Sequence, residues 1–261
     1  MFPSYSKSEQ EQLLQQMEDN LYHLYEEIAQ QAGETNKFDE LVKSVNLPNV
    51  SWPRTIFDRP TKEVDFAQVV SKIQGGTLPP FWIMCRREEE DIHRQLLANG
   101  FRHMAQWPGM VLPLDNRSYP SIGDEIEIVL LSQKEELKDW LELVNNNLMK
   151  TNPLDDSLFQ KCFGDISGLQ FYGLKVGGQM VSTGLTYLRE GMLGLYMLST
   201  DKRHRRRGYT TLLLQHILAA ASQQGQRIAG LQASEDGKWV YPKLGFQTIC
   251  HFDIYWLLGY R

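Results

Sequence analysis

The sequence has few cysteines and lacks several common cofactor signatures. Its three cysteines, Cys85, Cys162 and Cys250, include no CxxC pair, and an odd number cannot form a closed set of disulfides. This spacing is typical of a reducing compartment and gives no zinc signature, so we expect no metal. The absence of GxxxxGK[ST] and GxGxxG segments argues against a Walker loop or a dinucleotide-binding loop.

Long hydrophobic runs and an excess of basic charge are also missing. No stretch reaches the roughly 18 consecutive apolar residues of a membrane helix, and the polar residues 1–12 lack the apolar core of a signal peptide. The formal net charge is -5, with 27 basic and 32 acidic residues, whereas a nucleic-acid or polybasic membrane binder would be basic. We therefore expect a cytoplasmic protein that binds neither nucleic acid nor a membrane.

The remaining composition is that of a globular protein. Of the 261 residues, 42% are hydrophobic and 23% are charged, which suits one large or two medium domains. Apolar steps of three and four predict an amphipathic helix over residues 8–31 that packs on the body of the protein. The rest of the first half predicts an irregular stretch over 33–62, a helix over 66–73 and a buried strand over 81–85. A charged helical segment over 86–99 and an extended segment over 101–114 follow.

Residues 115–123 (DNRSYPSIG) have the composition of a linker. The chain after this segment predicts a mixed α/β unit with strands over 125–131, 169–175, 180–188, 191–200 and 227–233, helices over 135–149, 157–163, 211–221 and 236–243, and two closing strands within 246–258. Residues 96–101 echo residues 241–246, which suggests two copies of one fold. We therefore predict a smaller domain over residues 1–120 and a second domain over residues 121–261.

The most distinctive local feature is a basic turn between a predicted strand and a predicted helix. Five of the 27 basic residues lie within residues 202–207, directly before Gly208. The first amides of a helix have no internal acceptors, and glycine lets an anion approach the backbone closely. This arrangement predicts a diphosphate-binding turn. A solvated basic loop is the plainer alternative, and a nucleic-acid patch would need interleaved aromatic residues.

Two segments resemble motifs of the GNAT acetyltransferase superfamily. Residues 205–210 (RRRGYT) resemble the [Q/R]xxGx[G/A] signature, with Thr210 where Gly or Ala is usual. Residues 233–246 resemble the NxxAxxLYxKxGF segment; Tyr241, Lys243, Gly245 and Phe246 match, while Ser234, Gly237 and Val240 replace Asn, Ala and Leu. The resemblance implies a C-terminal GNAT fold, with a central mixed, mostly antiparallel sheet flanked by helices. It also implies a degenerate GNAT-like first half without a coenzyme site.

The resemblance also implies a cosubstrate and a set of site residues. Acetyl-CoA would bind with its pyrophosphate on the basic turn and its pantetheine arm on the splayed end of the central strand. Tyr241 would serve as the general acid toward the coenzyme thiolate, or would only pack beneath the cosubstrate. The implied cofactor-binding residues are Leu198, Ser199, Thr200, Arg205, Arg206, Arg207, Gly208, Tyr209, Thr210 and Ser234.

The resemblance therefore implies an N-acetyltransferase that would transfer acetyl directly to the primary amine of a small molecule or an amino-acid-like substrate. Direct transfer is expected because no cysteine falls within the cofactor motifs. The general base is open, with Asp201, Glu190, Glu235 or a water relay as candidates. A catalytically weak CoA-binding or partner-binding module and a longer acyl donor remain alternatives. Aromatic residues of the first half, Trp52, Phe57, Phe81, Trp82 and Trp107, are candidates to line an acceptor pocket between the halves.

Overall fold

The computed structural model describes residues 5–33, 41–47, 50–57, 64–86, 91–235 and 237–259. The strands in these residues are β1 (Ser44–Asn46), β2 (Arg54–Ile56), β3 (Phe81–Cys85), β4 (Phe101–Pro113), β5 (Ile126–Leu130), β6 (Leu169–Val176), β7 (Gln179–Arg189), β8 (Met192–Thr200), β9 (Ile228–Gln232) and β10 (Gln247–Leu257). The helices are α1 (Lys7–Gln31), α2 (Phe66–Gln74), α3 (Ile92–Ala98), α4 (Lys134–Asn147), α5 (Asp156–Cys162), the short 3-10 helix η1 (Lys202–His204), α6 (Tyr209–Gln223) and α7 (Tyr241–Leu244).

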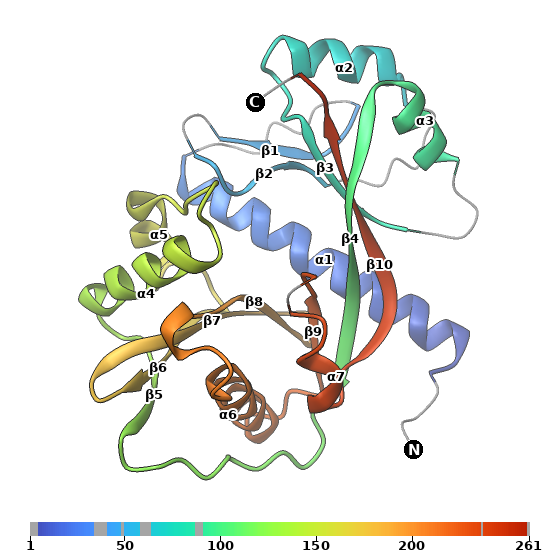
Figure 1. The fold of residues 1–261 in the computed structure, drawn as a ribbon. Helices are drawn as coiled ribbons and strands as arrows, with labels where there is room; N and C mark the ends of the chain where they lie inside the picture. Colours follow the sequence, from blue (N-terminus) through green and yellow to red (C-terminus); the bar gives the residue numbers. More distant parts are fainter. Residues whose placement is uncertain are drawn as a thin grey trace.

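The ten described strands form one sheet in the order β1-β2-β3-β10-β4-β9-β8-β7-β6-β5. Neighbouring strands are antiparallel except for β2 with β3 and β8 with β9. In Figure 1, α6 lies on one side of the lower strands and α1 crosses the molecule between β1–β3 and β6–β8. This mixed, mostly antiparallel sheet with flanking helices is the predicted fold class. The strands and helices predicted between residues 125 and 233 are present with ends within two residues of the prediction.

The last strand of the chain lies in the half of the sheet that the first 113 residues build. β10 pairs with β3 on one side and with β4 on the other, and β4 also pairs with β9. The prediction of two closing strands within 246–258 is wrong, because the segment is one strand. Its ladder with β4 shifts register between Thr248 and Cys250 and again between Ile254 and Tyr255, and such irregularities bend a strand without ending it. The domain boundary at 120/121 stays a prediction.

Two other segments differ from the prediction. The stretch 33–62, expected to be irregular, contains β1 and β2, whose three residues each are too short for a periodic signal; residues 34–40, 48–49 and 58–62 of it lie outside the described residues. The helix expected over 236–243 begins only at Tyr241. Pro242 occupies its first turn, where the missing proline N–H leaves no hydrogen bond unmade. Asp236, the expected first residue of that helix, also lies outside the described residues.

The long first helix packs on the body of the protein, as predicted. Ser6 caps it through a capping box with Glu9. Its apolar stripe, including Met17, Leu24 and Ile28, is buried in the largest core cluster together with residues of α4 and α5. Residues of α6 and α7 contribute to a second cluster. All three cysteine side chains are buried. No helix of the described residues is both long and apolar enough to cross a membrane.

Candidate active site

A gap between two parallel strands creates the candidate site. β8 pairs with β9 only over Met192–Gly194, opposite Ile228–Gly230, although β8 continues to Thr200. The ladder of β8 with β7 is also irregular at this point: it shifts register between Thr183 and Leu185, and Met197 has a φ of 48°. The carboxyl end of β8 is therefore free of its parallel neighbour. The expected splay near Leu198 is present.

A cavity of about 400 Å³ opens where β8 leaves β9, and this volume is within the usual range for small-molecule sites. Both halves of the chain contribute to its wall. Its lining residues are Leu21, Tyr25, Trp52, Arg54, Thr55, Phe81, Ile83, Trp107, Leu148, Met149, Thr151, Asn152, Leu195, Tyr196, Met197, Leu198, Gln232, Ser234 and Tyr241. Trp52, Phe81 and Trp107 line this cavity, whereas Phe57 and Trp82 belong to the buried core.

Tyr241, the predicted general acid, lies at this cavity. It is the first residue of α7, its side chain lines the cavity, and it is 8% exposed. Burial raises the pKa of its phenol to about 12, so the hydroxyl stays protonated at neutral pH. Gly237 lies against the ring, since a Cβ there would come within 3.1 Å of the Tyr241 hydroxyl oxygen. Leu198 and Ser234 also line the cavity, whereas Ser199 and Thr200 do not appear in the described lining.

The basic turn places a row of backbone amides at the end of β8. Gly208 caps α6 with a φ of 82°, and Arg206 has a φ of 62°. The first amide of this helix with a backbone acceptor is that of Leu212, which donates to the carbonyl of Gly208. In the described part of the chain, the amides of residues 208–211 have no hydrogen-bond acceptor. Such amides suit the oxygens of a diphosphate.

Thr210, the departure from the GNAT signature, has a structural role. Its hydroxyl lies 2.6 Å from that of Thr200, which lies 2.9 Å from that of Ser182. The Ser182 hydroxyl donates to the carbonyl of Ser199. This chain of hydroxyl groups joins β7, β8 and the first turn of α6. It therefore holds the amides of the turn against the splayed strand.

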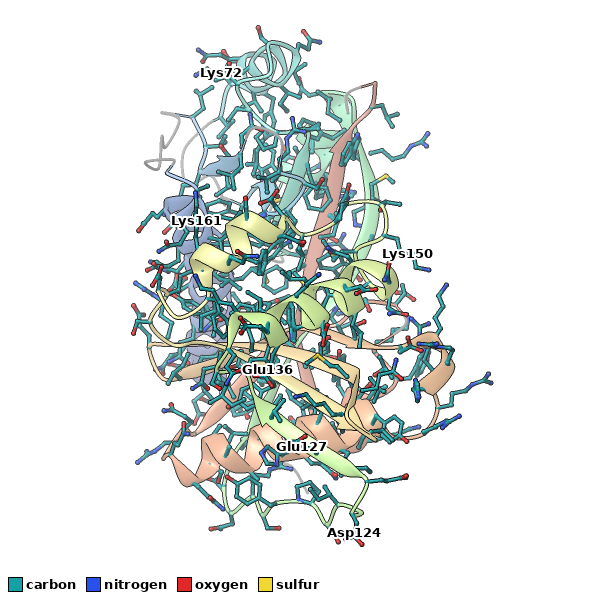
Figure 2. The ribbon with its side chains drawn as sticks, turned by 90° about the vertical axis from the view of Figure 1, so that its left-hand side faces the viewer. Lys72, Asp124, Glu127, Glu136, Lys150 and Lys161 are labelled. Carbon is teal, nitrogen blue, oxygen red and sulfur yellow. The ribbon has the colours of Figure 1, made fainter. Side chains whose placement is uncertain are left out.

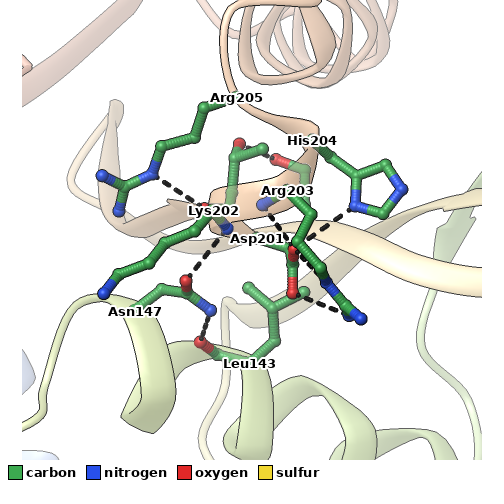
Figure 3. A network of polar contacts seen from close by, with 9 residues as sticks. Leu143, Asn147, Asp201, Lys202, Arg203, His204 and Arg205 are labelled. Atoms are coloured by element: carbon green, nitrogen blue, oxygen red, sulfur yellow. Dashed lines mark hydrogen bonds and ion pairs between the residues drawn. The ribbon is translucent and has the colours of Figure 1, made fainter.

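Figure 3 shows how Asp201 shapes the same turn. Its carboxylate accepts hydrogen bonds from the backbone N–H and the side chain of Arg203 and contacts the His204 ring. The Arg203 side chain is the largest cause of the lowered pKa of Asp201, about 2. The Lys202 amide donates to Asn147 of α4, and the Arg205 Nε donates to the carbonyl of Thr200. The turn is thus fixed to both α4 and β8.

Further positive charge gathers beside the turn. Lys150 lies just beyond the end of α4 opposite to Glu136 (Figure 2). The nearby ammonium group of Lys202 lowers the pKa of Lys150, and Arg205 adds to this effect. Like charges raise the local potential for an anion. The Arg206 and Arg207 side chains make no hydrogen bond or ion pair within the described residues.

The three candidate bases lie away from the described lining of the cavity. The carboxylate of Asp201 accepts hydrogen bonds from Arg203. With a pKa of about 2, this carboxylate is a weak base at neutral pH. Glu190 is in an exposed turn beside Arg189, and exposed Glu235 pairs with Lys238 at 2.7 Å. Among the described lining residues there is no Asp, Glu or His. The water relay stays a prediction.

Three lining residues carry no signal in the sequence. Tyr25 lies in the apolar stripe of a predicted helix, where a core position is expected. Tyr196 lies in the apolar run of a predicted buried strand. Arg54 stands in a segment whose pattern predicts no element. They come from α1, β2 and β8, and the tertiary fold brings them to one cavity.

The geometry of this site agrees with the similarity of the chain to known proteins. Residues 150–251 match the family model of the acetyltransferase (GNAT) domain, so this chain contains a GNAT acetyltransferase domain. A GCN5-related N-acetyltransferase from Kribbella flavida is 14% identical over 91% of this chain and 95% of its own, with a TM-score of 0.67. A GCN5-related N-acetyltransferase from Sphaerobacter thermophilus is 15% identical over 82% and 75%, with a TM-score of 0.61.

A tandem GNAT protein from the clavulanic acid biosynthesis pathway is also similar in structure. It is 12% identical over 77% of this chain and 73% of its own, with a TM-score of 0.57. No curated protein sequence matches this chain. At such identities the similar structures establish the GNAT fold of this chain and leave its substrate open.

Proposed function

We propose that this protein is an acetyl-CoA-dependent N-acetyltransferase that acts on the primary amine of a small molecule or an amino-acid-like substrate. The observation that carries the proposal is the row of unpaired amides at residues 208–211, which lies beside the cavity that Tyr241 lines. A diphosphate fits these amides, and a thioester arm fits the open end of β8. The GNAT domain over residues 150–251 supports the same assignment.

In this proposal the residues of the chain have distinct tasks. The cosubstrate supplies an acetyl thioester. The amides of residues 205–210 hold its pyrophosphate, and the Leu198 backbone amide polarises the acetyl carbonyl. The amine nitrogen bonds to the acetyl carbon, the carbon–sulfur bond breaks, and Tyr241 protonates the sulfur while the amine proton leaves through water. Burial in the shared cavity disfavours the thiolate as well as the phenolate, which keeps this proton transfer feasible.

The cofactor site is tested by acetyl-CoA titration of Gly208→Glu, followed by calorimetry. The added carboxylate would repel the pyrophosphate, so we expect at least a tenfold loss of affinity. Gly225→Glu is a matched control, because Gly225 lies at the other end of α6 with a φ of 81° and, like Gly208, has open space around its Cβ position. Equal affinity losses in the two variants would contradict the proposed site. No binding by the wild type would contradict the enzyme assignment itself.

The acid role is tested by Tyr241→Phe. Removing a general acid lowers turnover by about 10²–10⁴-fold, whereas the ring that packs in the cavity is retained. We expect kcat to fall by this range with the dissociation constant for acetyl-CoA unchanged. A variant with the turnover of the wild type would show that Tyr241 only packs in the site.

One observation favours a second candidate function. The described lining of the cavity offers no side chain of ordinary basicity to accept the amine proton. A catalytically weak module that binds CoA or a partner would need no such group. Acetyl-CoA binding without acetyl-CoA consumption across a broad panel of amines would favour this module over the enzyme.

A further inference from the structure

The charge of the cavity wall points to the class of acceptor. We propose that the acceptor carries a carboxylate that binds Arg54 and an aromatic or large apolar body that packs against the first half of the chain. Aromatic and large apolar amino acids have this chemistry. The inference rests on the proposed N-acetyltransferase function.

Arg54 gives the cavity a positive charge that the net charge of the protein does not suggest. It is the one charged side chain in the described lining, although the whole chain carries a net charge of -5. The other described lining residues are apolar or neutral polar. In a site partly shielded from water, an unbalanced guanidinium attracts an anion much more strongly than on the surface. A purely cationic amine would meet repulsion in the same place.

The guanidinium of Arg54 is oriented before any ligand binds. Its Nε donates to the Oδ1 of Asn46 at 3.0 Å. The amide nitrogen of Asn46 donates to the carbonyls of Gly76 and Thr77, which turns its oxygen toward Arg54. Among the described residues, no carboxylate lies within ion-pair distance of Arg54. The remaining guanidinium N–H groups are therefore available for a carboxylate, whose two oxygens match their fork geometry.

Aromatic side chains complete the acceptor side of the cavity. Tyr25 and Trp52 meet edge to face, with ring centroids 5.6 Å apart. Phe81 and Trp107 line the same space. Aromatic walls suit an apolar body, and they also attract cations through their faces. Because Arg54 already supplies a cation there, the cation–π use is disfavoured and an apolar group beside a carboxylate is favoured.

The same cavity connects this acceptor side with the reaction centre. Arg54 and the aromatic residues come from the first half, whereas Tyr241 and Leu198 come from the GNAT domain. A molecule whose carboxylate is fixed at Arg54 would present its amine toward the splayed end of β8. An α-amino acid carries the two groups on one carbon, with its side chain free to reach the aromatic wall.

The experiment compares L-phenylalanine with phenethylamine, which lacks the carboxylate. The wild type should acetylate phenylalanine with the higher kcat/KM. Arg54→Met should lower kcat/KM for phenylalanine by about 10- to 100-fold, the range for a lost charged hydrogen bond. The same variant should leave kcat/KM for phenethylamine unchanged or raise it, because the repulsion by Arg54 is removed. Arg102→Met is the control, because Arg102 is an exposed arginine of β4. Melting temperatures would verify that both variants fold.

A binding readout separates this inference from the proposed function. Trp52 and Trp107 lie in the cavity wall, so ligand binding should change the tryptophan fluorescence. We expect phenylalanine to change it in the wild type and in Arg102→Met, and not in Arg54→Met. A preference of the wild type for phenethylamine, or equal losses for both amines in Arg54→Met, would overturn the inference. A fluorescence change with phenylalanine but no acetyl-CoA binding would refute only the proposed function.

Discussion

A buried asparagine of α1 joins the first half of the chain to the strand that carries the candidate site. Asn20 is 2% exposed. Its amide nitrogen donates to the carbonyls of Tyr187 and Met192, at 3.1 and 3.0 Å, and its oxygen accepts from the Tyr196 hydroxyl at 2.7 Å. Tyr196 in turn lines the cavity. We therefore predict that Asn20→Ala lowers both the stability of the protein and the order of the site.

The size of the effect follows from the three hydrogen bonds. A buried hydrogen bond contributes about 1 kcal/mol net, so Asn20→Ala should lower the free energy of unfolding by about 3 kcal/mol. For a chain of this length, about 1 kcal/mol shifts the melting temperature by about 2–4 °C. We expect a fall of about 6–12 °C in Asn20→Ala. Tyr196→Phe removes one of the three bonds and should cost about 1 kcal/mol.

The assay is urea unfolding of the two single variants and the double variant. Once Asn20 is replaced, the Tyr196 hydroxyl has no partner to lose, so the double variant should be about as stable as Asn20→Ala. Strict additivity of the two effects would refute the coupling. A loss below about 1 kcal/mol in Asn20→Ala would refute the reasoning from buried hydrogen bonds.

Three further perturbations test other parts of the structure. Gly194→Ala would place a Cβ onto the Asn20 side-chain oxygen; we expect a cost of about 1–3 kcal/mol in urea unfolding, and a cost near zero would contradict this packing. Asp253→Ala removes the partner of Arg86 and His103, at 2.6 and 2.9 Å, and should cost about 2–3 kcal/mol, with Asp253→Asn losing less. The raised pKa of Tyr241, about 12, stabilises the fold fully below pH 10, the ordinary pKa of tyrosine, and is lost as the pH rises toward 12. Wild-type stability should therefore fall more steeply between pH 10 and 11 than that of Tyr241→Phe, and equal slopes would count against the burial of this phenol.

The elements with a strong hydrophobic periodicity could be predicted from the sequence. The elements whose extent depends on pairing with other strands could not. The stripe of α1 and the apolar run of β8 each carry their own signal, since one face or both faces are buried. β1 and β2 have three residues each and pair with one another, so their stability comes from the sheet. The local sequence pattern of β10 likewise predicts two strands. Its pairing with β3 and β4 along its length makes it one.

The candidate site divides in the same way. The turn around Gly208 and the segment that ends at Phe246 carry local motifs, because a helix start and a left-handed glycine are properties of neighbouring residues. The acceptor wall has no such motif. Arg54 lies 187 residues before Tyr241 in the numbering of the chain, and the two share a cavity only after the sheet has formed. A cavity shared by residues so far apart in sequence depends on the whole topology, and no sequence spacing reveals it.

The topology also explains why a substrate site would need both halves. β8 has two parts: its first three residues pair with β9, and its end is free to line the cavity. The free end could bind a cosubstrate alone, but it offers a small amine only one wall. α1, fixed on β8 through Asn20, brings Tyr25 to the wall of the same cavity, and β2 adds Arg54. The first half of the chain would therefore define which amine reacts, and the GNAT domain would define what is transferred to it.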